Sequence, residues 1–457
     1  MFFLIFSLYM SIASLFGILF RSYLIFLAAL IILSNFFKRF LFIGGDPGIL
    51  YNTLLLIPDF FLLFYIICKS KHLFFINKKI FFFLFSLFVS GVIFLSNVLV
   101  SIAYIKIFVI YIFFYFFGKE TVLKNNYDYD FFKDKFSNFI FLVVIIGTVY
   151  IFLQRVNNYF SFEKAWLSSG YATIGGNYFA DMGVYRYISI FSGLREAAIY
   201  FIIGIFFVYY YNGTFLKVPI KWIIYVCLIG ALILVGSRGS LVGLMIAIIV
   251  IKYIINKKRL MVLTGVILCI FFLIYFNPVL LNELDEFMMG GVKSSYLRRM
   301  LFSASLGARV MFWGEMIPEH LFQGDGLGAY TSAASLGGLN PGSESQIISF
   351  LLQGGMLLMI AYLTIVYGIF KIHFLNKSIE KSNGKKNVSL NIVILILMLI
   401  IFDSLFNPTL DSRATSVVFW YYLGVLYTYF TYFAKYRKNL YSKTFVKRST
   451  NENTVCA

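Results

Sequence analysis

Apolar runs long enough to cross a lipid bilayer follow one another along almost the whole chain. An α-helix needs about 20 apolar residues to span the hydrocarbon core, where only helices and closed barrels satisfy their backbone hydrogen bonds. The runs lie near residues 2–20, 22–37, 49–68, 80–98, 101–117, 136–153, 196–211, 220–235, 240–255, 260–276, 346–370, 390–407 and 413–433. Hydrophobic residues make up 61% of the 457 residues and charged ones 13%, values far from those of soluble domains. The sequence therefore predicts an all-α polytopic integral membrane protein with about 12–13 transmembrane helices. We treat residues 1–457 as a single transmembrane domain.

The basic residues set the expected orientation. The formal net charge of +19 comes from short connections between apolar runs, not from one face with interleaved aromatics, so we expect no nucleic acid partner. These connections alternate with neutral or acidic ones, and the positive-inside rule places the basic set in the cytoplasm, with membrane lipids around the spans. The basic set comprises residues 69–79, 119–135, 217–221, 257–259, 371–386 and a basic tail at 435–457.

Two long connections then face the outer side, at residues 154–195 and 277–345. The second holds more acidic than basic residues and a helix-like stretch, Ser305 to Leu321, before a glycine-rich turn. Loops of this length in compact proteins are usually functional or disordered. The break Gly236–Ser240, between two apolar runs, faces the same side. We therefore look for function on the outer face.

Arg238 lies inside that break. An arginine at the end of a spanning helix is costly unless it meets an anion or reaches the interface. Snorkelling to phospholipid headgroups explains most such arginines. The alternative is a fixed cation at the membrane surface that receives a lipid-linked phosphate. The residues alone leave both interpretations open.

The large outer loop adds further candidates. Arg309 and Trp313 are one helical turn apart, which suits either a sugar or phosphate contact or docking of an amphipathic helix on the membrane. His320 is the one histidine expected outside, and a lone exposed histidine is usually inert. Glu344 lies where the loop re-enters the bilayer, so desolvation would raise its pKa and suit it to proton abstraction. Stabilisation of the next helix through its dipole explains Glu344 equally well.

Other polar groups are expected on this face. An ion pair with Glu196 is the simplest explanation for Arg195, but adjacent helical residues do not face each other, which leaves Arg195 free to point elsewhere. Internal pairing is the expected role of Asp403 and of the turn Asp411-Ser412-Arg413. The sequence has neither a dinucleotide fingerprint nor a phosphate-cradling lysine loop nor a His/Cys metal cluster. We expect no cofactor, no metal and no disulfide.

These segments together resemble the O-antigen polymerase and O-antigen ligase superfamily of bacterial envelope glycosyltransferases. The likeness covers roughly residues 186–433 and rests on the order, spacing and common face of several short motifs. The motifs are Ser237-Arg238-Gly239, Arg309-x-x-x-Trp313 with Pro318 and Gly324-x-Gly326-x-Gly328, Gln346 to Leu358 with Gly354-Gly355, and the segment Arg186 to Tyr200. The ligases typically carry a histidine at the start of the helix after the large loop. This chain has Glu344-Ser345-Gln346 there, which favours the Wzy-type polymerases.

The resemblance implies a GT-C-like enzyme of the bacterial inner membrane with its site facing the periplasm. Such an enzyme transfers a growing glycan from its undecaprenyl diphosphate carrier onto a new lipid-linked repeat unit, by inversion and without a metal. A protein that regulates chain length is a further partner of this kind of enzyme. Arg238 and Arg309 would stabilise the leaving diphosphate. The ligase histidine has no counterpart here, which leaves the base unassigned, and Glu344 is our candidate to activate the acceptor hydroxyl. Further substrate-binding candidates are Arg186, Arg195, Arg298, Trp313 and His320.

Three alternatives stay beside this expectation. Two share its chemistry, an O-antigen ligase and a capsule-type polymerase. The third belongs to another class, a flippase for lipid-linked oligosaccharides. A flippase is expected to have short loops and charges lining a central cavity, which differs from charges gathered at one face.

Overall fold

The structure is a computed structural model, and it describes most of the chain before residue 245 and after residue 345. The described residues are 2–45, 47–69, 77–93, 98–125, 127, 129–169, 178–179, 184–185, 187–211, 218–237, 240, 244–245, 316–318, 320–328, 345–383, 387–405 and 407–452.

The fold is helical, and every apolar run expected within the described part is a helix. The expected runs at 240–255 and 260–276 lie largely or wholly outside that part. The helices are α1 (Phe2–Leu19), α2 (Tyr23–Phe40), α3 (Ile49–Lys69), α4 (Lys78–Ile93), α5 (Val98–Lys124), α6 (Lys135–Asn157), α7 (Ser161–Ser168), α8 (Leu194–Tyr210), α9 (Val218–Val235), α15 (Gln346–Asn383), α16 (Val388–Ser404) and α17 (Arg413–Glu452). Short 3-10 helices are η1 (Leu41–Gly44) and η6 (Thr409–Asp411), and β1 (Tyr178–Phe179) pairs antiparallel with β2 (Val184–Tyr185).

Five segments in the described part are long and apolar enough to cross a membrane. They are Phe2–Leu19, Tyr23–Ile43, Lys135–Asn157, Val218–Val235 and Gln346–Ser378. Leu56–Tyr65 and Val388–Ser404 are shorter apolar helices. Helices of this length and composition are those of a polytopic membrane protein.

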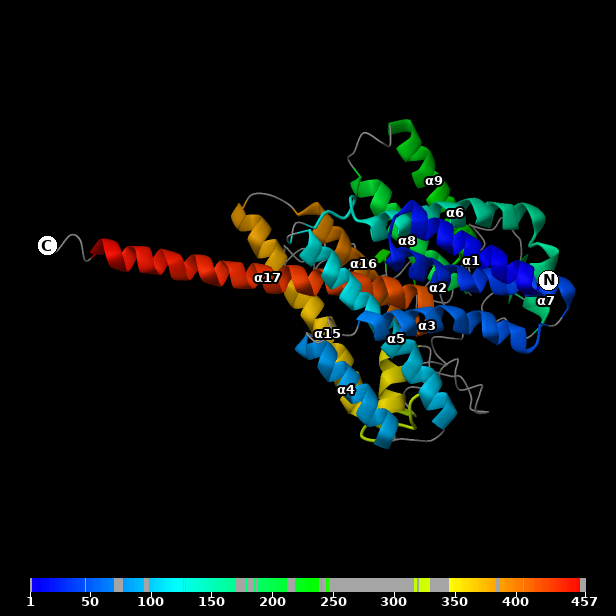
Figure 1. Cartoon of the computed structure of the whole chain (residues 1–457), viewed down its shortest axis with the longest axis horizontal. Coiled ribbons are helices and arrows are strands. Elements are labelled where there is room, and N and C mark those ends of the chain that lie inside the picture. The colour runs from blue at the N-terminus through cyan, green and yellow to red at the C-terminus, as the bar shows by residue number, and fades with distance from the viewer. Residues whose placement is uncertain are drawn as a thin grey trace, which may run out of the picture.

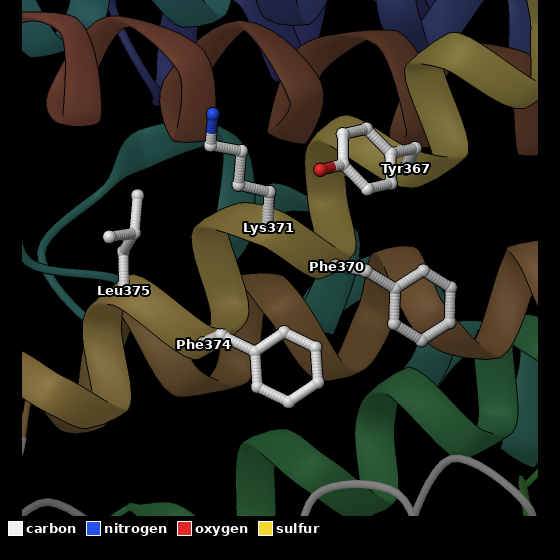
Figure 2. A pocket seen from close by; sticks show the side chains of 5 residues that line it. All are labelled: Tyr367, Phe370, Lys371, Phe374 and Leu375. Atoms are coloured by element: carbon white, nitrogen blue, oxygen red, sulfur yellow. The ribbon is translucent and has the colours of Figure 1, made fainter.

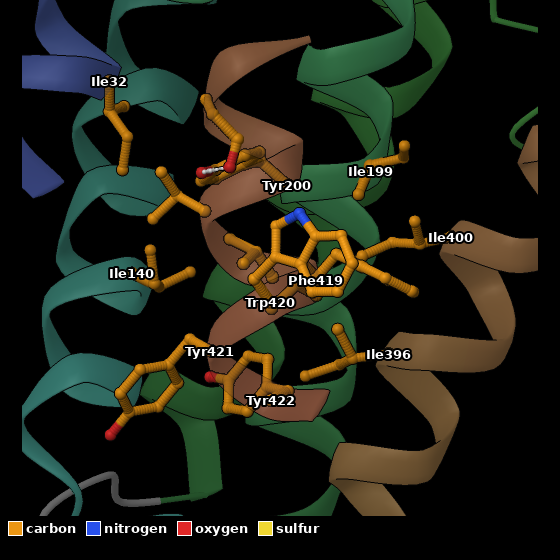
Figure 3. Close-up of a cluster of buried hydrophobic side chains, with 14 of the residues drawn as sticks. Ile32, Ile140, Ile199, Tyr200, Ile396, Ile400, Phe419, Trp420, Tyr421 and Tyr422 are labelled. Carbon is orange, nitrogen blue, oxygen red and sulfur yellow. Dashed lines mark hydrogen bonds between the residues drawn. The ribbon is translucent and has the colours of Figure 1, made fainter. Parts of the chain in front are cut away.

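Helix α17 is the centre of the bundle. Its residues Phe419 to Tyr422 are buried against isoleucines of α2, α6, α8 and α16 (Figure 3). Two glycines let α17 approach α5 closely, because a Cβ at Gly118 would lie 2.0 Å from the carbonyl oxygen of Tyr421, and one at Gly424 would lie 2.0 Å from that of Tyr115. Small residues at such a crossing are the usual means of close helix packing in membranes.

Two helices continue beyond the lengths expected from hydropathy. Helix α17 runs on to Glu452 through the basic tail expected as a separate segment, and it projects far from the bundle (Figure 1). Helix α15 likewise continues to Asn383, past the point where a basic connection was expected. A helix needs no apolar face once it leaves the bilayer, so hydropathy marks where its apolar part ends but not where the helix ends.

A buried ion pair fixes the connection between α6 and α8. The guanidinium of Arg39, at the end of α2, lies 2.9 Å from the carboxylate of Glu163 in α7, and both side chains are fully buried. Arg39 also donates to the carbonyl oxygen of Ser189 at 2.5 Å, and Gln154 donates to Glu163 at 2.6 Å. The connection at 154–195 is therefore tied to the bundle through its described residues.

Candidate functional site

Several connections meet at one end of the bundle. The hydroxyl of Ser240, the last residue of the break that follows α9, donates to Asp403 at the end of α16 at 3.0 Å. The backbone amide of Gln346, at the start of α15, donates to the carbonyl oxygen of Asn407 at 3.2 Å. The Ser412 hydroxyl donates to Glu196, in the first turn of α8. We call this cluster the polar junction, and its described members are Arg195, Glu196, Ser237, Ser240, Gln346, Asp403, Asn407, Thr409, Asp411 and Ser412.

Asp403 has a structural role in the polar junction. One carboxylate oxygen accepts from Ser240 at 3.0 Å and from the Asn407 amide at 3.1 Å, and the other accepts from the Thr409 hydroxyl at 2.5 Å. The side chain is fully buried. These bonds hold the break after α9 against the connection between α16 and α17, so the expectation of internal pairing is confirmed for Asp403.

Asp411 differs from Asp403 in its expected role, because its pKa lies close to neutral pH. Burial raises the pKa of its carboxyl to about 7, against the opposing effects of hydrogen bonds from Gln346 and Tyr104 and of the positive charge of Arg195. The Gln346 amide donates to Asp411 at 3.2 Å and the Tyr104 hydroxyl at 3.4 Å. Gln346 is itself held by the Leu410 backbone amide, which donates to it at 2.9 Å. A carboxyl poised in this way can accept a proton at neutral pH.

Among the arginines expected to bind phosphate, Arg195 is the one that the structure describes. Glu196 accepts from the Ser192 hydroxyl at 2.6 Å and from Ser412, and it forms no salt bridge with Arg195. Among the residues that the structure describes, no hydrogen bond or salt bridge engages the Arg195 guanidinium. Its charge nevertheless acts on Asp403 and Asp411. The expectation that Arg195 does not pair with Glu196 is confirmed.

The turn at Gly324–Gly328 docks on a break in α15. The backbone of Gly355 has φ 63° and ψ −165°, a conformation open essentially to glycine alone, so the carbonyls before it have lost their helical partners. The amide of Asp325 donates to the carbonyl oxygen of Leu352 at 2.8 Å and that of Gly326 to Gln353 at 3.1 Å. The expected tight turn is confirmed, because Gly326 and Gly328 both have positive φ.

Gln353 connects this turn to Asp411. The oxygen of its side-chain amide accepts from the backbone amide of Gly328 at 2.8 Å. The nitrogen of the same side chain donates to the Tyr104 hydroxyl at 3.2 Å and to the Ser349 hydroxyl at 2.5 Å. Tyr104 in turn donates to Asp411. A continuous hydrogen-bonded path therefore joins the turn at Gly324–Gly328 to the Asp411 carboxyl.

His320 is neither exposed nor alone. Its side chain is largely buried, its Nδ1 lies 2.8 Å from the carbonyl oxygen of Met316, and its Nε2 lies 2.9 Å from the carboxylate of Asp325. The expectation of a lone exposed histidine is therefore wrong. Asp325 lies five residues later in the sequence and approaches His320 only once the turn has folded. In this arrangement His320 anchors the docked turn.

The candidates from the sequence divide into two groups. Arg195 and His320 are described, and Arg195 alone belongs to the polar junction. Ser237 and Ser240 flank Arg238 in the sequence, and their hydroxyls lie 3.0 Å apart in the polar junction. The candidates outside the described residues are Arg186, Arg238, Arg298, Arg309, Trp313 and Glu344.

The sequence alone did not point to the residues whose hydrogen bonds lead to Asp411. Gln346, Ser349 and Gln353 are three and seven positions apart, which places them on one face of a helix. Polar side chains at that spacing within an apolar run are a signal that could have found them. Tyr104 carries no such signal, because tyrosines are common throughout the chain.

No protein-family model matches the chain, and no curated protein is significantly similar to it.

Proposed function

We propose that the protein is a polyprenyl-diphosphate-dependent glycosyltransferase that polymerises lipid-linked O-antigen repeat units, acting in a GT-C-like membrane fold at the periplasmic face of the bacterial inner membrane. One observation carries the proposal. A carboxyl with its pKa near 7, Asp411, lies within electrostatic reach of Arg195, a guanidinium without a described partner. The break that contains Arg238 is hydrogen-bonded into the same polar junction through Ser240.

The cations suit the leaving group. A glycan carried on undecaprenyl diphosphate leaves behind a diphosphate at the membrane surface. Guanidinium groups bind phosphate oxygens through charge-assisted, often bidentate hydrogen bonds, and they stabilise charge that develops as the glycosidic bond breaks. Arg195 is proposed for this role together with Arg238 and Arg309. Arg186, Arg298 and Trp313 remain proposed substrate contacts.

The carboxyl suits the acceptor. In the proposed step the acceptor hydroxyl oxygen of the new repeat unit attacks the anomeric carbon of the donor sugar and passes its proton to the Asp411 carboxylate. The bond from that carbon to the diphosphate oxygen breaks, and the electron pair leaves with the diphosphate. A single displacement of this kind inverts the anomeric configuration. Glu344 is the second candidate for the proton acceptor.

A flippase is the candidate from another class. A flippase is expected to have charges that line a central cavity. Asp411 and Arg195 instead belong to one cluster at one end of the bundle, which favours a transferase that acts at a membrane surface. A ligase or a capsule-type polymerase would use the same chemistry with another acceptor. A chain-length regulator is a proposed partner of the polymerase.

The test is a reaction in liposomes that contain the purified protein and a lipid-linked repeat unit. Growth of a ladder of polymer on a gel supports polymerisation. Translocation of single units without growth would instead establish a flippase. Arg195→Ala and Arg238→Ala should each abolish the ladder and leave the single-unit glycolipid. The matched control is Lys124→Ala, which removes an exposed cation that pairs with Glu120 at 2.8 Å. Full ladders from either arginine variant would exclude that arginine from the diphosphate site.

A further inference from the structure

A hollow on the surface of α15 lies apart from the polar junction. It has a volume of 420 Å³ and is lined by Tyr367, Phe370, Lys371, Phe374 and Leu375 (Figure 2). Four of these side chains are apolar or aromatic, and Tyr367 is 65% exposed. Exposed apolar surfaces of this kind mark sites of membrane or ligand contact.

The hollow lies where the apolar part of α15 ends. The apolar run at 346–370 stops just before Lys371, which opens the basic connection at 371–386. Aromatic and lysine side chains are enriched at this boundary, where an apolar body meets lipid chains and a polar tip reaches the headgroups. Tyr367 and Lys371 therefore have the composition and the position of an interfacial band.

A second lysine comes from another helix. Lys79, in the first turn of α4, places its ammonium 5.3 Å from the centre of the Tyr367 ring. The same nitrogen would lie 2.6 Å from a Cβ built on Gly368, so it rests directly on the turn of α15 that carries Lys371. The two positive charges act on each other.

Neither lysine has an acidic partner among the described residues. Lys377, one and a half turns further along α15, shows the contrast, because it forms a salt bridge of 3.1 Å with Glu380. Two like charges close enough to act on each other repel, and an anion between them would relieve that repulsion. The two lysines favour an anionic group, and the apolar lining of the hollow favours a hydrocarbon chain. One ligand that has both would satisfy the whole surface.

We propose that this hollow binds an anionic phospholipid, with the headgroup phosphate between Lys79 and Lys371 and an acyl chain along Phe370 and Phe374. The site does not depend on the proposed transferase activity. Each lysine near an anionic lipid contributes about 1 kcal/mol. This corresponds to roughly fivefold in affinity for each lysine and about 25-fold for the pair.

The test is lipid titration of the purified full-length protein in neutral detergent, followed by native mass spectrometry. The probe is dioleoyl phosphatidylglycerol, with dioleoyl phosphatidylcholine as the neutral comparison. The Lys79→Gln/Lys371→Gln double variant should weaken the tightest phosphatidylglycerol binding by about 25-fold and leave phosphatidylcholine unchanged. Lys371→Arg keeps the charge and should keep the binding.

The matched control removes the same charge elsewhere. Lys124→Gln/Lys133→Gln changes two exposed lysines that pair with Glu120 and Asp130. Equal loss of phosphatidylglycerol in both double variants would show a general charge effect and overturn the site. Retention of the lipid by the Lys79→Gln/Lys371→Gln variant would overturn it too. So would displacement of the lipid by millimolar glycerol phosphate, because the ligand would then be a soluble phosphate. Unchanged helicity by circular dichroism shows that the variants are folded.

Discussion

Asp411 gives the sharpest prediction about activity. If its carboxylate accepts the proton of the acceptor hydroxyl, the rate follows the fraction of Asp411 that is deprotonated. With a pKa of about 7, that fraction rises about fivefold between pH 6 and pH 7 and less than twofold between pH 7 and pH 8. The initial rate of polymer formation in liposomes should show this profile.

The surroundings of Asp411 predict how the profile moves. The charge of Arg195 and the hydrogen bond from Gln346 both lower the pKa of this carboxyl. Gln346→Ala therefore removes an effect that favours the charged form, and the midpoint of the profile should move to higher pH. The shift in midpoint separates electrostatic tuning from simple loss of substrate binding, which lowers the rate without moving the midpoint.

Asp411→Asn is the decisive variant. The asparagine oxygen can still accept from Gln346 and Tyr104, so the hydrogen bonds of the polar junction are kept. The rate should fall about 10²- to 10⁴-fold, the usual contribution of a general base, and the rise between pH 6 and pH 7 should disappear. The same substrate is present in every reaction, so titration of its diphosphate is controlled. An Asp411→Asn enzyme that keeps the wild-type profile would refute the assignment, as would a midpoint that moves to lower pH in Gln346→Ala.

Three further predictions concern stability, each measured by thermal unfolding in detergent. The pKa of Asp411 is about 7 in the folded protein against about 3.9 unfolded. The Asp411 carboxyl therefore makes a contribution to stability that is lost as pH rises from 4 to 7, and the Tm of wild type should fall relative to that of Asp411→Asn over this range; an equal difference in Tm at both pH values would contradict this. Gly355→Ala should cost about 1–3 kcal/mol, because φ is positive and the new Cβ would lie 2.7 Å from the Phe322 carbonyl oxygen; an unchanged Tm would show that the break adapts. Arg39→Met should cost about 3–5 kcal/mol by leaving Glu163 buried and unpaired, and adding Glu163→Leu should recover most of the loss; no recovery would mean that packing, not charge, sets the cost.

Hydropathy allowed most of the helices to be predicted. Runs such as 136–153 and 220–235 correspond to α6 and α9 because, in lipid, a long apolar segment has almost no alternative to a helix. Helix ends were less accurate: α17 continues to Glu452 because helix formation does not stop where apolarity stops. The β1–β2 hairpin was not predicted, since two strands of two residues each leave no periodic pattern.

The candidate site was predictable by residue type but not by partner. The sequence identified Arg195 as a free cation and assigned Asp403 and Asp411 to internal pairing. It could not tell the two carboxyls apart. Asp403 receives three hydrogen bonds from side chains of the break and of the connection after α16, whereas Asp411 receives two, from Gln346 and Tyr104. These partners are up to 307 positions away in the sequence.

The sequence by itself determined that this chain is a membrane protein and that its fold is helical, because both depend on the local composition of segments of about 20 residues. The tertiary structure decided which polar groups meet, since a carboxyl acquires its pKa from the burial and the donors that distant helices supply. The break at Gly355 and the turn at Gly324–Gly328 illustrate the division. Their glycines were visible in the sequence, but only the folded chain showed that each provides the hydrogen-bond partners that the other lacks.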